Sequence, residues 1–184
     1  GLKLNEYLPT DKKIKTSIFY NNIGLIYQEL NLNEKALNYH LKAYNSRIKD
    51  HLRKEQAASL NNIGICYHAM NRNDEALESY RKGLLIAEES GNVIDYYKIS
   101  ENIGNAFQSQ KKFKQSIPYY QKILEIKDSV AINPKTFLGV YTGLSSAYNE
   151  IGEPKKGLFY GNKGLEIISR NPDFTYYSTS LYQQ

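Results

Sequence analysis

Apolar residues recur along the chain every three or four positions, which is the spacing of an amphipathic helix. Ile14, Ile18, Ile23, Ile26 and Leu30 follow this spacing near the start. No stretch alternates between apolar and polar residues one by one, as a half-buried strand would. The pattern therefore predicts an all-α chain of helices joined by short turns.

Short polar breaks divide the helical pattern into pairs. Asparagine, glycine and proline favour helix ends and turns, so they mark where one helix stops and the next begins. The breaks within pairs fall at 31–33, 71–73, 111–112 and 152–154, and those between pairs at 91–92, 133–134 and 171–172. Near Asp50-His51 the signal is weak, and there we expect two helices to run almost into one another.

A four-residue motif repeats at a fixed interval. Asn21-Asn22-Ile23-Gly24 returns letter for letter at Asn61-Asn62-Ile63-Gly64 and then as Glu101-Asn102-Ile103-Gly104. A fourth, weaker copy follows at Thr142-Gly143-Leu144-Ser145 after a one-residue insertion. The copies lie 40 or 41 residues apart, so each unit is predicted to be one pair of helices.

We predict one repeat array over residues 1–184. Both ends are expected to fall within repeats. The predicted parts are the end of a preceding repeat (1–9), repeat 1 (10–50), repeat 2 (51–91), repeat 3 (92–132), repeat 4 (133–171) and the start of a truncated fifth repeat (172–184).

The second unit carries the fullest motif. Leu60-Asn61-Asn62-Ile63-Gly64-Ile65-Cys66-Tyr67, followed by Asp74-Glu75-Ala76-Leu77-Glu78-Ser79-Tyr80-Arg81-Lys82-Gly83-Leu84, resembles a tetratricopeptide repeat. The usual period of that family is about 34 residues, so the longer period here implies longer helices. Long-period arrays of this composition resemble the sensory regions of Bacteroidetes-type histidine kinases and helix-turn-helix transcription regulators. The resemblance implies a right-handed α-solenoid of antiparallel helix pairs, whose first helices line a concave groove.

The side of each first helix that faces away from the apolar residues is the candidate binding surface. Its amides can both donate and accept hydrogen bonds, which suits the backbone of a bound peptide, and its apolar residues offer footholds. The candidate ligand-binding residues are Asn21, Asn22, Leu25, Asn61, Asn62, Ile65, His68, Lys98, Glu101, Asn102 and Asn105.

Two interpretations of the asparagines remain open. They either contact a ligand, as similar columns do in the long-period arrays of G-protein-regulator adaptors, which this chain also resembles, or they brace neighbouring helices. Chaperone-tail clamps of the same family use lysines on this face to bind a terminal carboxylate. Here that row holds Asn21, Asn61, Glu101 and Thr142, which argues against such a ligand.

Composition excludes several function classes. The net charge is +5, but acidic residues interrupt almost every basic run, so we expect no nucleic-acid binding. The three histidines and the single cysteine, Cys66, lack the spacing of a metal site, and no catalytic constellation or cofactor motif is present. We expect Cys66 to be a small buried residue, and Gly157, Gly161 and Gly164 to permit close helix packing.

The predicted function is therefore that of a non-catalytic scaffold that binds a protein or peptide segment. It would be the sensing or docking region of a bacterial signal-transduction or transcription regulator. The alternative is a self-association module that forms homodimers through its end repeats. No apolar run reaches the roughly 18 residues of a membrane helix, so we expect a soluble chain, cytoplasmic or periplasmic, without membrane contact.

Overall fold

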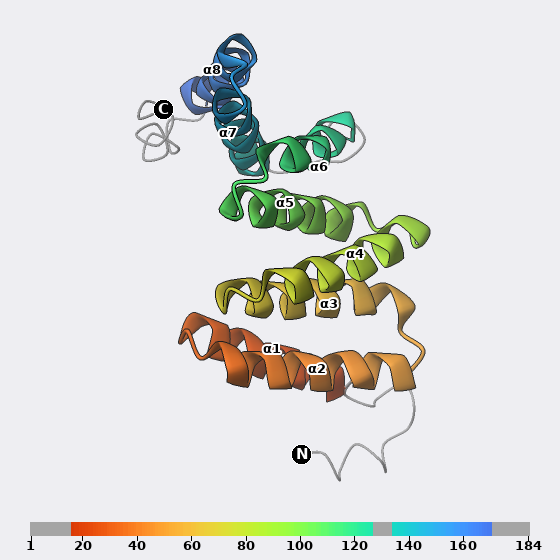
Figure 1. The fold of residues 1–184 in the computed structure, drawn as a ribbon. Helices are drawn as coiled ribbons and strands as arrows, with labels where there is room; N and C mark the ends of the chain where they lie inside the picture. The colour runs from red at the N-terminus through yellow and green to blue at the C-terminus, as the bar shows by residue number, and fades with distance from the viewer. Residues whose placement is uncertain (1–15, 127–133, 171–184) are drawn as a thin grey trace. The chain divides into compact units, whose positions relative to one another are not determined.

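The computed structural model describes residues 16–126 and 134–170, which form eight α-helices and contain no strand (Figure 1). The chain divides into two compact units, Gly1–Ile99 and Ser100–Gln184, so the boundary falls within α5. The helices are α1 (Thr16–Glu29), α2 (Asn33–Lys49), α3 (Arg53–Ala69), α4 (Asn73–Glu89), α5 (Val93–Ser109), α6 (Phe113–Glu125), α7 (Pro134–Glu150) and α8 (Pro154–Arg170).

Each pair closes through the same turn. Two residues after the first helix ends, a residue takes a positive φ, and the amide that follows it donates to the carbonyl of the aromatic residue five positions earlier. Asparagine and glycine tolerate this left-handed conformation, which explains the polar breaks in the sequence. The positive-φ residues are Asn31, Asn71, Lys111 and Gly152, and the aromatic acceptors are Tyr27, Tyr67, Phe107 and Tyr148.

The expectation that α2 and α3 would run almost into one another is wrong. His51 takes a φ of 55°, and the Leu52 amide donates to the Arg47 carbonyl over 2.8 Å. These features form the same reversal as the Asn and Gly turns, although histidine gives a weaker sequence signal for it.

The repeated glycines make room for rings of the second helix. A methyl group added at Gly104 would lie 2.6 Å from Tyr120 Cζ, and one at Gly24 would lie 2.6 Å from His40 Cε1. Gly64 meets the Tyr80 ring in the same way. In all three pairs the ring lies sixteen residues after the glycine, so this contact sets how closely the two helices pack.

In the fourth helix pair the larger residue lies on the first helix and the glycine on the second. Ser145 occupies the position of the glycine, and Gly161 lies sixteen residues later where the other pairs carry a ring. Ser145 Oγ would lie 3.2 Å from a methyl group at Gly161, and it donates to the Gly157 carbonyl over 2.9 Å. The predicted close packing at Gly157 and Gly161 is confirmed, with α7 as the neighbour.

The sequence also predicts that Tyr39, Tyr80 and Tyr120 pack between units with their hydroxyls at the surface, and for Tyr80 and Tyr120 this is wrong. Both tyrosines are buried, as is His40, which occupies the equivalent position in the first pair. The Tyr120 hydroxyl donates to Asn105 Oδ1 over 2.6 Å.

His40 and Cys66 belong to a buried polar chain in the first unit. His40 Nε2 lies 3.1 Å from Gln28 Oε1, and Gln28 Nε2 donates to Cys66 Sγ over 3.4 Å. Burial, with a contribution from Arg47, lowers the pKa of His40 from 6.5 to about 4, and burial raises the pKa of Cys66 to about 11. The imidazole is therefore neutral and the thiol protonated at neutral pH. Cys66 is fully buried, which confirms its predicted place in the core.

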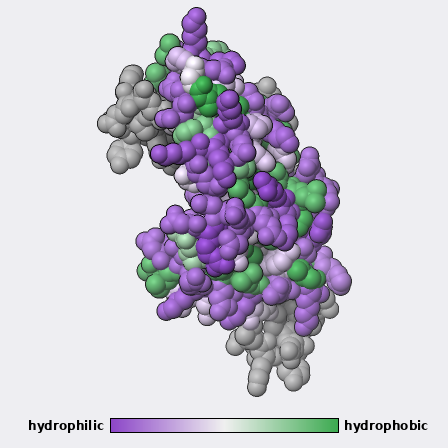
Figure 2. Space-filling model, viewed as in Figure 1, coloured by the Kyte–Doolittle hydropathy of each residue, from purple (hydrophilic) through white to green (hydrophobic). Residues whose placement is uncertain are grey.

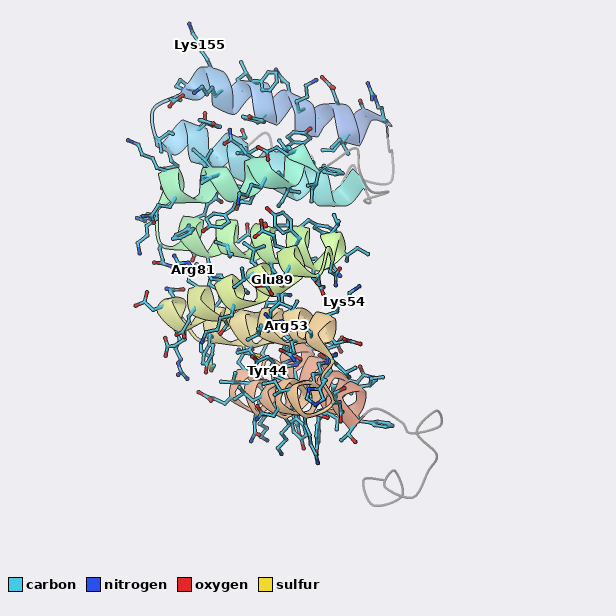
Figure 3. All side chains as sticks on the ribbon, turned by 90° about the vertical axis from the view of Figure 1, so that its right-hand side faces the viewer. Tyr44, Arg53, Lys54, Arg81, Glu89 and Lys155 are labelled. Carbon is cyan, nitrogen blue, oxygen red and sulfur yellow. The ribbon has the colours of Figure 1, made fainter. Side chains whose placement is uncertain are left out.

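Polar side chains also join consecutive helices of the first unit. The buried Arg47 of α2 donates through Nη1 to the Glu55 carbonyl and to Ser59 Oγ, both at 2.7 Å, and so ties α2 to α3. At the surface, Arg53 Nη2 lies 2.7 Å from Glu89 Oε2 and joins the start of α3 to the end of α4 (Figure 3). The first of these contacts is buried and the second is solvent-screened, so removal of the acceptors of Arg47 would cost more stability than loss of the exposed pair.

Substitution of Gly104 by alanine should destabilise the protein. The added methyl group would overlap Tyr120, and overpacking of this kind costs about 1–3 kcal/mol, which outweighs roughly 1 kcal/mol of improved helix propensity. Thermal unfolding followed by circular dichroism should show a lower Tm. Gly161→Ala is the matched control, since it gains the same propensity with only Ser145 Oγ nearby; an equal fall in both variants would contradict the ring contact as the cause.

The neutral His40 should make stability fall as pH is lowered. Because its folded pKa of about 4 lies below the ordinary value of 6.5, the unfolded chain binds the proton more readily between these values. The contribution is present above pH 6.5 and is lost as the pH falls towards 4. We expect roughly 2 kcal/mol less stability at pH 5 than at pH 7 from this group.

Urea unfolding of wild type and His40→Tyr at pH 7 and pH 5 measures this contribution, because tyrosine occupies the position in the next two pairs. The variant should lose most of the pH dependence. His51→Asn, at an exposed turn, is the control and should retain it. An unchanged pH slope in His40→Tyr would contradict the assignment.

Candidate functional site

The first two residues of the repeated motif are less buried than the last two. Ile63 and Gly64 are buried in the first unit, and Ile103 and Gly104 in the second, whereas the two residues before each of these pairs are half-buried. We call the part of each first helix that carries the candidate residues its first-helix surface; in the first unit it holds the candidates of α1 and α3 and Lys98 of α5, and in the second unit the remaining candidates of α5. Hydrophilic side chains cover most of the protein surface visible in Figure 2.

Two of the candidate asparagines bond to one another. Asn62 Nδ2 donates to Asn21 Oδ1 over 2.9 Å, and both side chains are half-buried between α1 and α3. Asn22, the neighbour of Asn21, is exposed. The pair therefore braces the two first helices, while a ligand-binding role of these residues stays a prediction.

The apolar candidates in this unit are partly accessible. Leu25 is 40% exposed on α1, whereas Ile65 and His68 on α3 are half-buried. Asn61 is half-buried as well. The structure thus brings an exposed amide and an apolar side chain together on α1, with a more covered set on α3.

Lys98 lies on the part of α5 that belongs to the first unit. Its side chain is exposed, and its charge acts on Asp95 one turn earlier. Burial raises the pKa of Asp95, while Lys98 and Arg47 oppose that shift. Lys98 thus has an electrostatic role within its own helix.

The remaining candidates lie in the second unit on α5. Glu101 and Asn102 are half-buried and Asn105 is exposed. Asn105 Oδ1 accepts a hydrogen bond from the Tyr120 hydroxyl, so its amide oxygen already has a partner. Burial raises the pKa of Glu101, and its carboxylate lies so near Gly139 that a methyl group there would be 2.6 Å from Oε1.

Sequence reasoning missed the contacts that join α5 to α7. Gln108 Nε2 donates to the Gly143 carbonyl over 2.6 Å, and the Tyr120 ring also meets Gly143, where a methyl group would lie 2.6 Å from Cζ. The available signal was the exchange of the repeated asparagine for Gly143 in the fourth copy. A glycine at that position makes room for the ring and allows the side chain of Gln108 to reach the backbone.

The described ranges hold no cluster of three or more histidine, cysteine, aspartate or glutamate residues that could ligate a metal. None of the helices in these ranges combines the length and apolar character needed to span a membrane. The candidate residues offer hydrogen bonding, apolar contact, the exposed ammonium of Lys98 and the half-buried carboxylate of Glu101.

Comparison with family models finds two matches to the tetratricopeptide repeat, over residues 15–89 and 97–129. The chain belongs to the tetratricopeptide repeat family. The predicted resemblance and the predicted all-α class of helical-repeat solenoid are thereby confirmed. None of the curated proteins compared with this TPR chain matches it.

Solved structures share the fold at low sequence identity. BtubC (BKLC) from P. vanneervenii aligns with a TM-score of 0.82 and 15% identity over 92% of this chain and 69% of its own. Aspartyl phosphate phosphatase F from Bacillus subtilis aligns with a TM-score of 0.81 and 17% identity, over 89% and 43%. The Rap conjugation gene regulator of plasmid pLS20, in complex with the Phr* peptide, gives 0.75 and 22%, over 97% and 48%. This TPR chain thus spans less than half the length of the last two.

Proposed function

We propose that this TPR chain is a non-catalytic scaffold that binds a peptide or protein segment on its first-helix surface. The observation that carries the proposal is the exposed amide of Asn22 beside the apolar side chain of Leu25 on α1. An amide can bond to peptide backbone of any sequence, and each such bond contributes about 1 kcal/mol net. An apolar residue beside it gives a bound side chain a surface to cover.

The similar Rap conjugation gene regulator, whose structure holds the Phr* peptide, supports a peptide as the ligand. That neighbour is a gene regulator, which also supports our finer proposal, that this chain is the sensing or docking region of a bacterial signalling or transcription regulator. The resemblance to Bacteroidetes-type kinases and regulators is part of that proposal. The repeat boundaries given above also remain a proposal.

Alanine at Asn22, Asn62 and Asn102 together should abolish peptide binding. Peptides are first selected from a random phage-displayed library on the wild-type chain, and the affinity of one synthetic peptide for each variant is then measured by fluorescence anisotropy. The control triple replaces Asn38, Asn45 and Asn162, which are exposed asparagines on second helices. Equal affinity of wild type and the first triple, with helicity unchanged, would refute binding on this surface.

Self-association is the second candidate function, and the outer side of α1 favours it. Ile26 is 55% exposed and Phe19 is 50% exposed. The equivalent residues of the later first helices, Cys66, Ala106 and Ala147 for Ile26, are fully buried. A second copy of the chain would cover this apolar side of α1 and bring any adjoining domain into a dimer.

Light scattering on the purified chain tests this candidate. Self-association predicts a dimer that Ile26→Ser weakens, because the substitution removes apolar area from the contact. Leu85→Ser on α4 changes a residue of the same exposure, 54%, and should leave the dimer intact. A monomeric wild type at all concentrations would contradict the candidate.

A further inference from the structure

Glu101 stands apart from the equivalent residues of the other repeats. Asn21, Asn61 and Thr142 occupy this position elsewhere, and none of them can carry a charge. Asn21 bonds to Asn62, and Thr142 Oγ1 donates to the Leu138 carbonyl over 2.8 Å. Glu101 is thus the one ionisable residue in the row.

The Glu101 carboxylate has no hydrogen-bond or ion-pair partner among residues 16–126 and 134–170. Three donors of the second unit bond to other acceptors. Tyr120 donates to Asn105 Oδ1, Thr142 to Leu138, and Gln108 to Gly143. A half-buried carboxylate that lacks a donor is costly to keep ionised.

Gly139 shows that the fold accommodates this carboxylate. It lies in the interior of α7, where glycine costs roughly 1 kcal/mol of helix propensity. It is exposed, and the atoms that an added methyl group would meet within 4 Å all belong to Glu101. The glycine therefore leaves space for the Glu101 side chain, in contrast to Gly104 and Gly143, which leave space for a ring.

An acceptor with no donor of its own is best satisfied by a cation that has donors and no acceptor. The arginine guanidinium presents five N–H donors in a plane, remains charged, and is less strongly hydrated than an ammonium group. A carboxylate or phosphate ligand would be repelled at this position. The local chemistry thus favours arginine over any acidic group.

We propose that Glu101, lodged against Gly139 between α5 and α7, binds an arginine side chain of the peptide ligand and so selects its sequence. This inference rests on the proposed peptide-binding function and adds the specificity that amides alone do not supply. Glu101 pairs with the arginine, while Gly139 positions the carboxylate. Peptides without arginine at the corresponding position would bind less tightly.

Phage-displayed random peptides selected separately on wild type and on Glu101→Gln test the proposal. Arginine should be enriched at one peptide position in the selections on wild type, and this enrichment should be absent from the selections on Glu101→Gln. A selected arginine peptide should bind Glu101→Gln at least about tenfold more weakly than it binds wild type. The citrulline analogue of that peptide should bind wild type more weakly by a similar factor. Both changes remove the same ion pair. The affinity of the citrulline analogue for Glu101→Gln should therefore be little lower than the affinity measured with either change alone.

The outcomes separate the two hypotheses. Glu150→Gln, an exposed glutamate on α7, is the matched control and should keep full affinity. One result would overturn the arginine site alone. In it, the selected peptides depend on Asn22, Asn62 and Asn102, but replacing arginine by citrulline lowers their affinity for Glu101→Gln as much as it lowers their affinity for wild type. Failure of both chains to select any peptide would overturn the peptide-binding function and the arginine site together.

The stability of the free chain gives an independent readout. Because burial raises the pKa of Glu101, the ionised form is disfavoured in the fold, and its cost grows as pH rises above the ordinary carboxyl range. Glu101→Gln should therefore raise the Tm at pH 7. A lower Tm would show that the carboxylate merely braces the helices, which would contradict a role reserved for a ligand.

Discussion

A ring of the second helix that lies against a glycine of the first is the contact on which the first three helix pairs depend. Burial of a large ring stabilises the pair, while the glycine costs helix propensity, and the two effects can be reconciled only if the ring lies where a side chain would have been. Tyr120 shows how far this constraint extends, because its ring meets both Gly104 and Gly143. One side chain thus sets the packing of α5 against α6 and also the position of α7.

The same constraint fixes the first-helix surface. Once Gly104 faces the Tyr120 ring, Asn102 two positions earlier is turned towards the other side of α5, while Glu101 three positions earlier lies at the margin of the same side. The first unit follows the same rule with Gly24 and Gly64, which places Asn21 and Asn62 close enough to bond. The surface residues owe their positions to a core contact, so a substitution at the glycines would disturb both.

Much of this architecture could be predicted from the sequence. The interval between Gly24, Gly64 and Gly104 defined the repeats, and the buried Ile63 and Ile103 lie where helical spacing puts them. The depth of the Tyr80 and Tyr120 rings could not be assigned, because the sequence does not show that each ring is buried against a glycine of the first helix. Periodicity places a residue on a side of a helix but does not distinguish between two neighbours.

The sequence predicts where the candidate residues lie on their helices, but it does not predict which of them form hydrogen bonds with one another. Side-chain spacing identified Asn21, Asn62 and Asn105 as surface residues, yet whether an amide meets a neighbour depends on distances of a few tenths of an ångström between helices. The bonds from Asn62 to Asn21 and from Tyr120 to Asn105 arise from packing that no single helix encodes. The change from asparagine to glutamate at position 101 was visible in the sequence, but the role of Gly139 in accommodating it was not.

If the chain binds a peptide as proposed, the two units recognise different features of that peptide. Amides such as that of Asn22 accept any peptide backbone, so they contribute affinity with little choice of sequence. A carboxylate without a donor penalises every ligand that leaves it unpaired, and specificity arises from that penalty as much as from the pair that forms. The raised pKa of Glu101 fits this division, because a residue that is unfavourable in the free chain can strengthen discrimination between ligands.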